Sequence, residues 1–429
     1  MIKQLVAPIY VQWEVTPLCN FKCIHCYNAW RRGVEKEYTT NVDLYPVITN
    51  EIIKNRIFHV TITGGEPLLV FEDIKPYLIR LHKANITMSI NTNATFVTEN
   101  LACELRNVGV THALVSVPCG IDDICDDITQ HHNSLKQIIK GIEILIKSGI
   151  IVSVNMVVTQ KNINNIYMTA EKLKEIPILR FGATRASSPC EYEKFNEFRI
   201  SRQQTSYMFT ELMRIEKELN IKTTSFEAYP YCSFETEAQF KKFGKKICSA
   251  GKAEVAISYN GEIKPCAHVN KAYGHVENGL KKAWYAMDHD WRQEINIPQS
   301  CNECIYREAC TGGCRQEAFS CFGSYNALDP MANPICLFRH TIIEQNTSIS
   351  DVYVLNPSLR MRKEKDGVVL LFVNVMCWLL VKEKLARFLL EETFINVKGV
   401  MDSLKIDKDI AVQILKQLEK KEIIMKGEK

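Results

Sequence analysis

Three cysteines near the start of the chain, Cys19, Cys23 and Cys26, are close enough in sequence to bind one metal centre together. They follow an apolar run, residues 9–15, that is typical of a strand, so we expect them on the loop after it. Three thiolates on one loop can hold three irons of a [4Fe–4S] cluster, which leaves the fourth iron open to a small molecule. A structural zinc site is the alternative, but zinc takes four ligands, usually with paired CX2C spacing. The CX3CX2C spacing therefore favours an iron–sulfur cluster with one open coordination position.

A second motif, Gly-Gly-Glu-Pro at residues 64–67, follows the next predicted strand. Glycine lets backbone groups come close to a ligand, and Glu66 supplies an anion for an ammonium group. Alone, this tetrapeptide is also compatible with a plain turn at a strand end. Placed one βα unit after the CX3CX2C loop, it resembles the corresponding segment of radical S-adenosylmethionine (SAM) enzymes. The resemblance implies that the open iron binds SAM and that residues 64–67 bind its amino group.

The same resemblance extends to later strand ends. It assigns SAM binding to His25, Gly64, Gly65, Glu66, Pro67, Asn93, Ser116 and Asn155. An asparagine such as Asn93 at a strand end is otherwise most often a turn former. Asn155 lies within an apolar strand, where a buried amide needs a hydrogen-bond partner. Two positions depart from the family, because Ala94 stands where glycine is usual and Thr129 stands where arginine is usual.

Two other cysteines, Cys119 and Cys321, are candidates for a catalytic thiol. Cys119 follows the fourth predicted strand, on the side where a substrate would lie, and its thiol could donate a hydrogen atom. The simpler interpretation, which we favour, is a small buried residue, since free cysteine behaves as a small hydrophobe. Cys321 could donate a hydrogen atom to a substrate radical. It could also be an alternative ligand of an auxiliary cluster, or a thiol with no role in the reaction. The sequence identifies no catalytic base.

The elements that must position these residues alternate between strands and helices through residues 1–190. The predicted strands are residues 10–15, 59–63, 87–91, 113–117, 152–158 and 179–182, and the amphipathic stretches between them are residues 42–54, 74–83, 99–108, 134–147 and 163–174. This alternation predicts right-handed βαβ units and a parallel sheet. Six units are fewer than the eight of a complete barrel. The fold class is therefore α/β, and the resemblance implies a partial (β/α)6 barrel with the site at the carboxyl ends of its strands.

A second group of cysteines follows a bridging helical region at residues 191–245. Its spacing resembles the SPASM domain, an irregular cysteine-rich module of radical SAM maturases that holds two auxiliary clusters, here over residues 246–345. The resemblance implies one [4Fe–4S] cluster on Cys301, Cys304, Cys310 and Cys336, and another on Cys248, Cys266 and Cys314 with Cys232 as the candidate fourth ligand. Residues 255–263 also predict a hairpin, with Asn260 and Gly261 in its turn. A double zinc module is the alternative.

The last part of the chain, residues 350–429, contains no cluster motif. Short strand-like runs over residues 353–372 precede three predicted helices, residues 382–392, 397–404 and 407–421, which is the outline of a small winged-helix-like α+β domain. It resembles the PQQ-peptide-chaperone-like domains that recognise precursor peptides by pairing a strand with an extended leader. DNA binding is the alternative, but the last helix carries charges of both signs rather than a basic face.

Composition excludes several classes of function. The 429 residues allow two or three domains, and the net charge of +4 gives no argument for a nucleic-acid surface. No apolar run reaches the roughly 18 residues that span a membrane, and the start of the chain does not resemble a signal peptide. Because the protein is not expected to be secreted, its seventeen cysteines are expected to be metal ligands rather than partners in disulfides. We therefore expect a cytoplasmic protein with neither nucleic-acid nor membrane partners.

These modules together predict an enzyme, a radical SAM oxidoreductase that cleaves SAM and oxidatively crosslinks a ribosomally made precursor peptide. It would need SAM, three [4Fe–4S] clusters and a reductant such as flavodoxin or ferredoxin. The alternatives are a peptide epimerase and a formylglycine-generating sulfatase maturase, although Ala267 replaces the aspartate that the latter carries after the cysteine matching Cys266. From a different class, a non-catalytic iron–sulfur regulator could bind DNA, but a sensor has no need for a SAM pocket.

Overall fold

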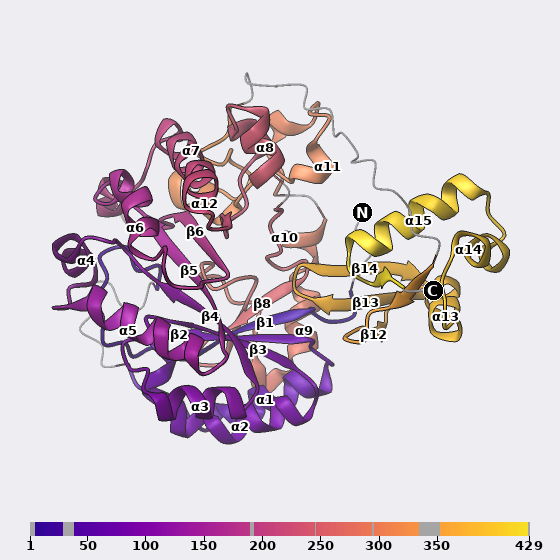
Figure 1. The fold of residues 1–429 in the computed structure, drawn as a ribbon, viewed down its shortest axis with the longest axis horizontal. Coiled ribbons are helices and arrows are strands. Elements are labelled where there is room, and N and C mark those ends of the chain that lie inside the picture. The colour runs from indigo at the N-terminus through magenta and orange to yellow at the C-terminus, as the bar shows by residue number, and fades with distance from the viewer. Residues whose placement is uncertain are drawn as a thin grey trace. The chain divides into compact units, whose positions relative to one another are not determined.

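The computed structural model describes residues 5–28, 38–188, 193–244, 246–293, 296–333 and 352–427. They form two compact units. The first holds the described residues from 7 to 333, and the second holds residues 352–427 together with Leu5 and Val6 (Figure 1). No helix in these ranges is long and apolar enough to cross a membrane.

The first unit is built on a sheet with ten strands among the described residues, in the order β10-β9-β8-β1-β2-β3-β4-β5-β6-β7. The strands are β1 (Tyr10–Thr16), β2 (His59–Gly64), β3 (Thr87–Thr92), β4 (Val110–Ser116), β5 (Ile151–Val158), β6 (Arg180–Arg185), β7 (Thr223–Thr224), β8 (Glu254–Ile257), β9 (Glu262–Lys264) and β10 (Gly274–His275). Neighbours from β8 through β1 to β7 are parallel, whereas β9 and β10 are antiparallel to their neighbours. This is the predicted α/β partial barrel.

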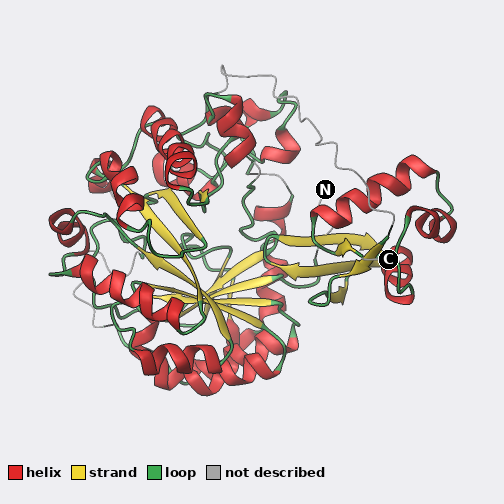
Figure 2. Ribbon diagram, in the orientation of Figure 1, coloured by secondary structure: helices red, strands yellow, loops and turns green. Residues whose placement is uncertain are grey.

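Helices follow the strands along the chain and lie around the outside of the sheet (Figure 2). Those of the first unit are α1 (Leu44–Lys54), α2 (Phe71–Lys83), α3 (Glu99–Asn107), α4 (Asp122–Thr129), α5 (Ser134–Lys147), α6 (Ile166–Lys172), α7 (Arg202–Leu219), α8 (Glu237–Phe243), α9 (Leu280–Ala286), α10 (Asp288–Arg292), α11 (Arg307–Cys310) and α12 (Arg315–Phe322). The six predicted strands and the predicted amphipathic stretches are present with their ends shifted by a few residues. The short helix α4 was not predicted.

Strand β1 carries the CX3CX2C loop at its end and is buried along its length. Val11, Trp13 and Val15 are completely buried, because helices cover the outer face of a parallel sheet and leave both faces of its strands without solvent. The Tyr45 hydroxyl of α1 donates to the Val15 carbonyl at 2.9 Å, and its ring meets Trp13 edge-on. The loop therefore starts from a strand that cannot shift without disturbing the core.

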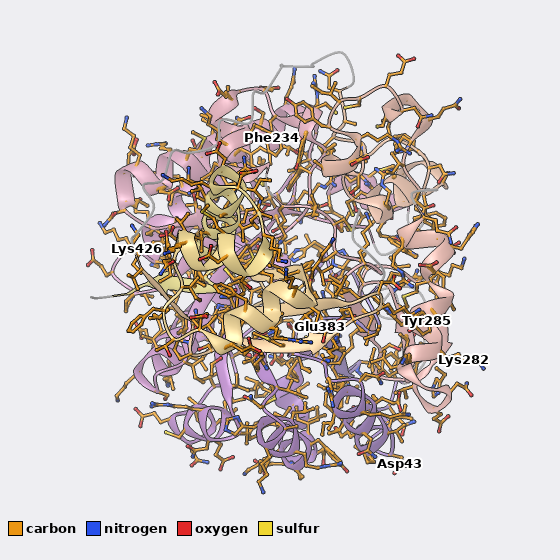
Figure 3. All side chains as sticks on the ribbon, turned by 90° about the vertical axis from the view of Figure 1, so that its right-hand side faces the viewer. Asp43, Phe234, Lys282, Tyr285, Glu383 and Lys426 are labelled. Atoms are coloured by element: carbon orange, nitrogen blue, oxygen red, sulfur yellow. The ribbon has the colours of Figure 1, made fainter. Side chains whose placement is uncertain are left out.

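The cysteine-rich region shares the sheet of the barrel. Its hairpin, β8 and β9, turns at Asn260 and Gly261 as predicted, and β8 pairs in parallel with β1, with Tyr10 opposite Glu254. The sequence does not predict that pairing. Beyond the hairpin the elements are short, as in α9, which buries Trp284 and leaves Lys282 exposed at the periphery (Figure 3).

A buried charged group links the end of β6 to the cysteine-rich region. The Arg185 guanidinium donates to both carboxylate oxygens of Asp329 at 2.9 Å and to Glu227 at 2.7 Å, and it lies over the Tyr229 ring. Asp329 also accepts from the backbone N–H of Cys314 at 2.8 Å. Because a buried charge is costly without its partner, this pairing fixes the cysteine segment against the barrel.

The second unit contains a three-stranded antiparallel sheet and three helices. Its elements are β11 (Tyr353–Leu355), β12 (Arg360–Lys363), β13 (Val368–Asn374), β14 (Cys377–Lys382), α13 (Glu383–Glu391), α14 (Val397–Leu404), α15 (Lys408–Lys420) and β15 (Ile424–Lys426). Strands β12, β13 and β14 form the sheet, and β11 pairs with β15. Leu371, Leu389 and Leu415 lie in its shared core. Strands followed by three helices match the predicted outline, although β14 was not predicted.

Candidate functional site

The CX3CX2C loop and the Gly-Gly-Glu-Pro segment meet at the carboxyl ends of β1 and β2, where Thr16 lies opposite Gly64. The backbone N–H of Gly65 donates to the Thr16 carbonyl at 2.7 Å, and that of Glu66 donates to the Leu18 carbonyl at 2.7 Å. At the other end of the loop, the Asn28 amide donates to the Gly64 carbonyl at 2.9 Å. The two motifs, which are separate in sequence, therefore form one structure.

Helix α4 supports the middle of the loop. The backbone N–H groups of Lys22 and Ile24 donate to the carbonyls of Thr129 and Ile128 at 3.0 Å, and the Phe21 ring packs against His131. Thr129, which replaces the arginine usual in the family, thus contributes through its backbone. The loop is held along its length by main-chain hydrogen bonds.

The donor set of this loop fits an iron–sulfur cluster. The side chains of Cys19, Cys23 and Cys26 are partly exposed. Thiolates are the usual ligands of such clusters, and the inorganic core holds them farther apart than the ligands of a single ion. In the described part of the chain, no three His, Cys, Asp or Glu side chains converge closely enough to hold one ion. The loop's chemistry and its three-cysteine count match a cluster with an open iron.

Glu66 is the buried carboxylate of the site. One of its oxygens accepts from the Thr92 hydroxyl at 2.7 Å and the Leu68 N–H at 3.1 Å, and the other accepts from the Asn93 N–H at 2.8 Å. The side chain is 1% exposed, and burial raises its pKa to about 7 although these hydrogen bonds oppose the rise. An ammonium group placed here would pair with a carboxylate that water does not screen.

The predicted residue Asn93 links the end of β3 to the cysteine loop. Its amide donates to the Asn20 side chain at 2.8 Å, and its oxygen accepts from the Thr95 hydroxyl at 2.7 Å. The Asn20 amide in turn donates to Thr95 at 2.9 Å. Ala94 has φ +61°, in the left-handed region, which explains why glycine is favoured there. Asn20, Thr92 and Thr95 escaped the sequence analysis because short polar residues near turns are common.

The remaining residues predicted to bind SAM lie on strands β4 and β5 and on the segments that follow β1 and β2. Ser116 of β4 is exposed and pairs in register with Asn155 of β5. The partner that Asn155 needs is the Thr184 hydroxyl of β6, which donates to its side-chain oxygen at 3.0 Å. Pro67 is buried at the start of a short 3-10 helix after Glu66, and His25 is partly exposed on the loop.

An aromatic contact joins the loop to the cysteine-rich region. The Tyr27 ring stacks on His268 with ring centres 4.3 Å apart. Burial raises the pKa of Tyr27 well above its ordinary value and lowers that of His268 to about 4, so both are neutral near pH 7. The buried Glu14–Lys264 ion pair, 3.2 Å long, makes a second link between β1 and β9. Neither contact has a signature in the sequence.

The two candidate catalytic thiols lie in different environments. Cys119 is completely buried, and burial raises its pKa, with a hydrogen bond to Thr169 opposing the rise. This placement favours the packing interpretation over a thiol that faces substrate. Cys321 on α12 accepts from the Arg199 guanidinium at 2.6 Å, and Arg199 also pairs with Glu317 at 3.0 Å.

The later cysteines lie on several short segments. The backbone N–H of Cys304 donates to the Cys301 carbonyl at 3.1 Å, and Cys310 ends α11 soon after this turn. The backbone N–H of Gly251 donates to the Pro265 carbonyl at 3.1 Å, which brings the segments of Cys248 and Cys266 together. The backbone N–H of Tyr231, the neighbour of Cys232, donates to the Cys310 sulfur at 3.3 Å. The grouping of these cysteines around clusters stays a prediction. Cys336 lies outside the described residues.

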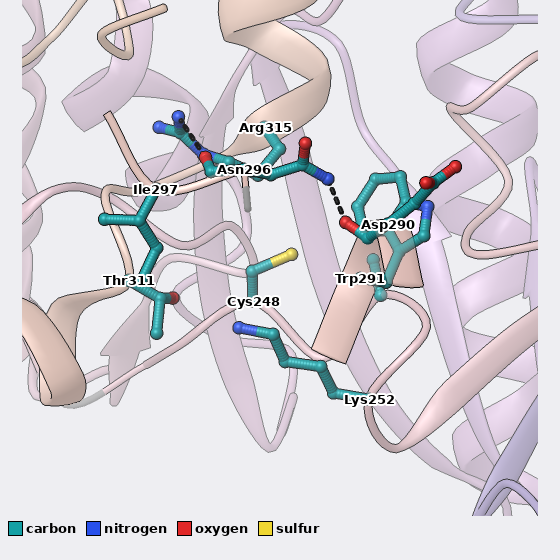
Figure 4. Close-up of a pocket in the computed structure, with 9 residues that line it drawn as sticks. Cys248, Lys252, Asp290, Trp291, Asn296, Ile297, Thr311 and Arg315 are labelled. Atoms are coloured by element: carbon teal, nitrogen blue, oxygen red, sulfur yellow. Dashed lines mark hydrogen bonds between the residues drawn. The ribbon is translucent and has the colours of Figure 1, made fainter. Parts of the chain in front are cut away.

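A pocket lies beside Cys248 (Figure 4). Trp291 and Thr311 line it together with the cations Lys252 and Arg315, whose charges oppose the burial that raises the pKa of Cys248. Positive charge beside this thiol favours its ionised form, which is the form that binds metal.

Gly65→Ala is expected to abolish SAM cleavage and to destabilise the protein. A Cβ at this position would lie 1.9 Å from the Leu18 carbonyl oxygen, so the cysteine loop would have to move. A shift of about 1 Å in a positioning element can cost about 100-fold in rate. Gly427→Ala is the control, because its Cβ would make ordinary contacts at 3.4 Å. SAM cleavage and thermal melting measure the effect, and wild-type rates in Gly65→Ala would contradict the close packing.

Known proteins resemble this chain in sequence and fold. The sequence profile of the radical SAM superfamily matches residues 13–173. An AdoMet-dependent heme synthase from Methanosarcina barkeri is 24% identical over 79% of this chain and 99% of its own length. The mycofactocin maturase MftC from Mycolicibacterium smegmatis is 23% identical over 73% of this chain and 80% of its own. SuiB from Streptococcus suis, solved with the precursor peptide SuiA, superposes with a TM-score of 0.60 at 20% identity over 78% of this chain and 77% of that one.

The superfamily match includes the CX3CX2C loop, the Gly-Gly-Glu-Pro segment, the end of β1 and strands β2 to β5. It therefore establishes SAM and the SAM-binding iron–sulfur cluster as cofactors of this chain. Residues 13–173 are a radical SAM domain, and the protein is an enzyme.

Proposed function

We propose that this enzyme oxidatively modifies a ribosomally made precursor peptide, forming a crosslink such as a thioether or a carbon–carbon bond. The observation that carries the proposal is the pairing of a radical SAM domain with a later region that has seven cysteines between Cys248 and Cys321. The similarity to MftC, a maturase, and the fold shared with SuiB support a peptide substrate.

The roles of the site residues follow from their contacts. Cys19, Cys23 and Cys26 would hold the cluster, and Glu66 would bind the SAM ammonium group. Bound together, the cluster and SAM supply a 5′-deoxyadenosyl radical that abstracts a hydrogen atom from an unreactive C–H bond. Asn93 would keep the loop and the end of β3 in one position through Asn20. Ser116 and Asn155 would line the rest of the SAM pocket with His25 and residues 64–67.

Oxidation of a substrate radical requires an electron acceptor and a route for the proton. Two auxiliary [4Fe–4S] clusters on the later cysteines would accept the electron, which makes three clusters in all. The ion group around Arg185 holds the Cys314 segment against the barrel, and this contact favours a short path between the two regions. A flavodoxin or ferredoxin would supply the electron that starts the reaction, which suits a cytoplasmic enzyme.

The second unit is the proposed binding site for the leader of the peptide. Its sheet ends in β12 on one side and β14 on the other, and an extended peptide could pair with an edge strand of such a sheet. Helix α15 keeps charges of both signs, which favours a peptide over DNA.

Heme synthesis is the competing function, because the heme synthase from M. barkeri matches over more of this chain than the maturase does. A peptide epimerase or a formylglycine-generating maturase would also use this SAM site. Since all four reactions begin with the same cleavage of SAM, the product must distinguish them.

The test is mass spectrometry of a candidate peptide encoded beside the gene, incubated with reconstituted enzyme, SAM and reductant. A crosslink lowers the peptide mass by two hydrogens, whereas epimerisation leaves it unchanged in water. Conversion of a heme precursor in a parallel assay, with the peptide unaltered, would replace our proposal with heme synthesis. A Cys19→Ala variant is the control for products that do not depend on the radical.

A further inference from the structure

Arg315, the first residue of helix α12, is a buried cation that lines the pocket beside Cys248 (Figure 4). It is only 5% exposed. The acceptors of its guanidinium are all backbone carbonyls, those of Asn296 at 3.2 Å, Tyr325 at 3.1 Å, Ala327 at 2.8 Å and Gly312. These neutral groups hold the side chain in place but leave its positive charge without a counter-charge.

The acidic side chains nearby are paired elsewhere. Asp290 lines the same pocket, but its carboxylate binds the Lys271 ammonium at 2.7 Å and the Tyr273 hydroxyl at 2.5 Å. Within the ranges that the structure describes, no carboxylate forms an ion pair with Arg315, and its buried Nε donates to no acceptor. A buried charge without an opposite charge is costly. The pocket therefore has a positive charge that suits an anionic ligand.

Two further groups of the pocket also suit an anion. Lys252 lines it from the turn just before β8, and its ammonium has no carboxylate partner among the described residues. The Thr311 hydroxyl, a possible donor, is buried without a partner in the same part of the chain. Gly312 has φ +79°, and a Cβ there would lie 3.1 Å from the Arg315 guanidinium. This turn thus leaves room for the guanidinium beside the pocket.

A cysteine-bound iron–sulfur centre is an anion of the kind that this pocket suits. Cys248 lines the pocket, and Arg315 directly follows Cys314, which is expected to bind the same centre. Each thiolate ligand is negative, and reduction adds one more negative charge. A fixed cation therefore stabilises the reduced form more than the oxidised form. Net charge is among the properties that set the potential of such a cluster.

We propose that Arg315, assisted by Lys252, raises the reduction potential of the auxiliary centre that Cys248 binds. The inference rests on the auxiliary clusters of the proposed function and deepens it, because a centre with a higher potential is a better acceptor for one electron. Arg315 would act through its charge and not as a ligand. Arg185 differs in this respect, because its buried guanidinium has the carboxylates of Asp329 and Glu227 as partners.

The test is a redox titration followed by EPR. It uses the full chain with Cys19, Cys23 and Cys26 all changed to alanine, so that only auxiliary centres give signals. The signal that disappears when Cys248→Ala is added belongs to the centre of interest. Adding Arg315→Gln should lower the equilibrium constant for reduction of that centre by at least about tenfold, which is about 59 mV for one electron. The potential of the second auxiliary signal should not change.

Three more variants separate charge from packing. Arg315→Lys keeps the charge without the planar fork, so its potential should stay closer to that of the unchanged side chain than the potential of Arg315→Gln. Lys252→Gln should shift the same signal in the same direction, and it retains the test if neither Arg315 variant folds. Lys282→Gln, which removes an exposed cation on α9, is the matched control and should shift neither signal. Thermal melting shows which variants are folded.

Several results would overturn the inference. One is an unchanged potential of the Cys248 signal in the folded Arg315→Gln and Lys252→Gln proteins. Another is an equal shift in Arg315→Gln and Arg315→Lys, which would indicate altered packing instead of lost charge. Both signals persisting in Cys248→Ala would also contradict it. A starting protein without either auxiliary signal would instead contradict the auxiliary clusters, and with them both the proposed function and this inference.

Discussion

Cys23→Ala is expected to abolish SAM cleavage, with a loss of more than about 1,000-fold, or roughly 4 kcal/mol at 1.36 kcal/mol per tenfold. The physical reason is that Cys23 is the middle cysteine of a loop that offers only three thiols. With one removed, the remaining two cannot hold a cubane in the geometry that presents an open iron to SAM. The measurement is 5′-deoxyadenosine formation under reducing conditions, together with iron content and the EPR spectrum of the reduced protein.

Cys103→Ala is the matched control for this prediction, because Cys103 is an exposed cysteine on α3. It should keep wild-type activity and iron. The two auxiliary centres should survive in Cys23→Ala, so iron falls by about four per chain rather than to zero. SAM cleavage at the wild-type rate in Cys23→Ala would contradict the assigned site, and the same substitution separates the enzyme from a non-catalytic regulator, which would cleave no SAM at all.

Glu66→Gln is expected to weaken SAM binding by about 10-fold to 150-fold. The variant keeps the size of the side chain but removes the negative charge that would pair with the SAM ammonium group. Hydrogen bonds to charged groups contribute about 1.5–3 kcal/mol, and each 1.4 kcal/mol is tenfold in affinity. The side-chain amide of glutamine would also face the N–H of Asn93, which now donates to the carboxylate. Equilibrium binding of SAM measures the loss, with the exposed Glu72→Gln on α2 as the control.

The pH dependence of SAM binding gives the sharper readout. Burial raises the pKa of Glu66 to about 7, so the ligand-free carboxyl group becomes increasingly protonated as the pH falls below 7. An ammonium ion binds the ionised form, so affinity should decrease toward about tenfold per pH unit below 7, and it should also fall above roughly pH 8, where an α-amino group loses its proton. In Glu66→Gln the decrease below pH 7 should disappear. The same slope in both proteins would show that another group binds the ammonium.

Local sequence patterns were sufficient to predict the strands and helices of the barrel. Each strand is a short apolar run bounded by polar residues, and each helix has apolar residues at helical spacing, so the order of strands and helices was predictable. The three cysteines of the first loop and residues 64–67 are also contiguous motifs. Parallel strands end at the same edge of a sheet, so the cysteine loop and residues 64–67 were expected to lie close together. The structure places Thr16 opposite Gly64.

Long-range pairings were not predictable in this way. Strand β8 joins β1 although their residues are more than two hundred positions apart in the chain, because a short apolar run does not encode its partner or register. The same holds for Arg185 and Asp329, whose ion pair depends on both being buried together. Asn20 and Thr95 looked like ordinary turn residues, and only their hydrogen bonds with Asn93 distinguish them.

By itself, the sequence determined the order of the barrel elements, the CX3CX2C loop, the acid Glu66 and the cysteine-rich region that follows the barrel. These features are encoded by residue types at short spacing, which local chemistry can interpret. Only the tertiary structure decided which distant segments lie together. Cys232 is closer in sequence to Cys248, but its neighbours Tyr231 and Pro230 pack on the segment that carries Cys310. Metal-binding sets form between atoms that are close in space, and chain folding, not sequence separation, sets that distance.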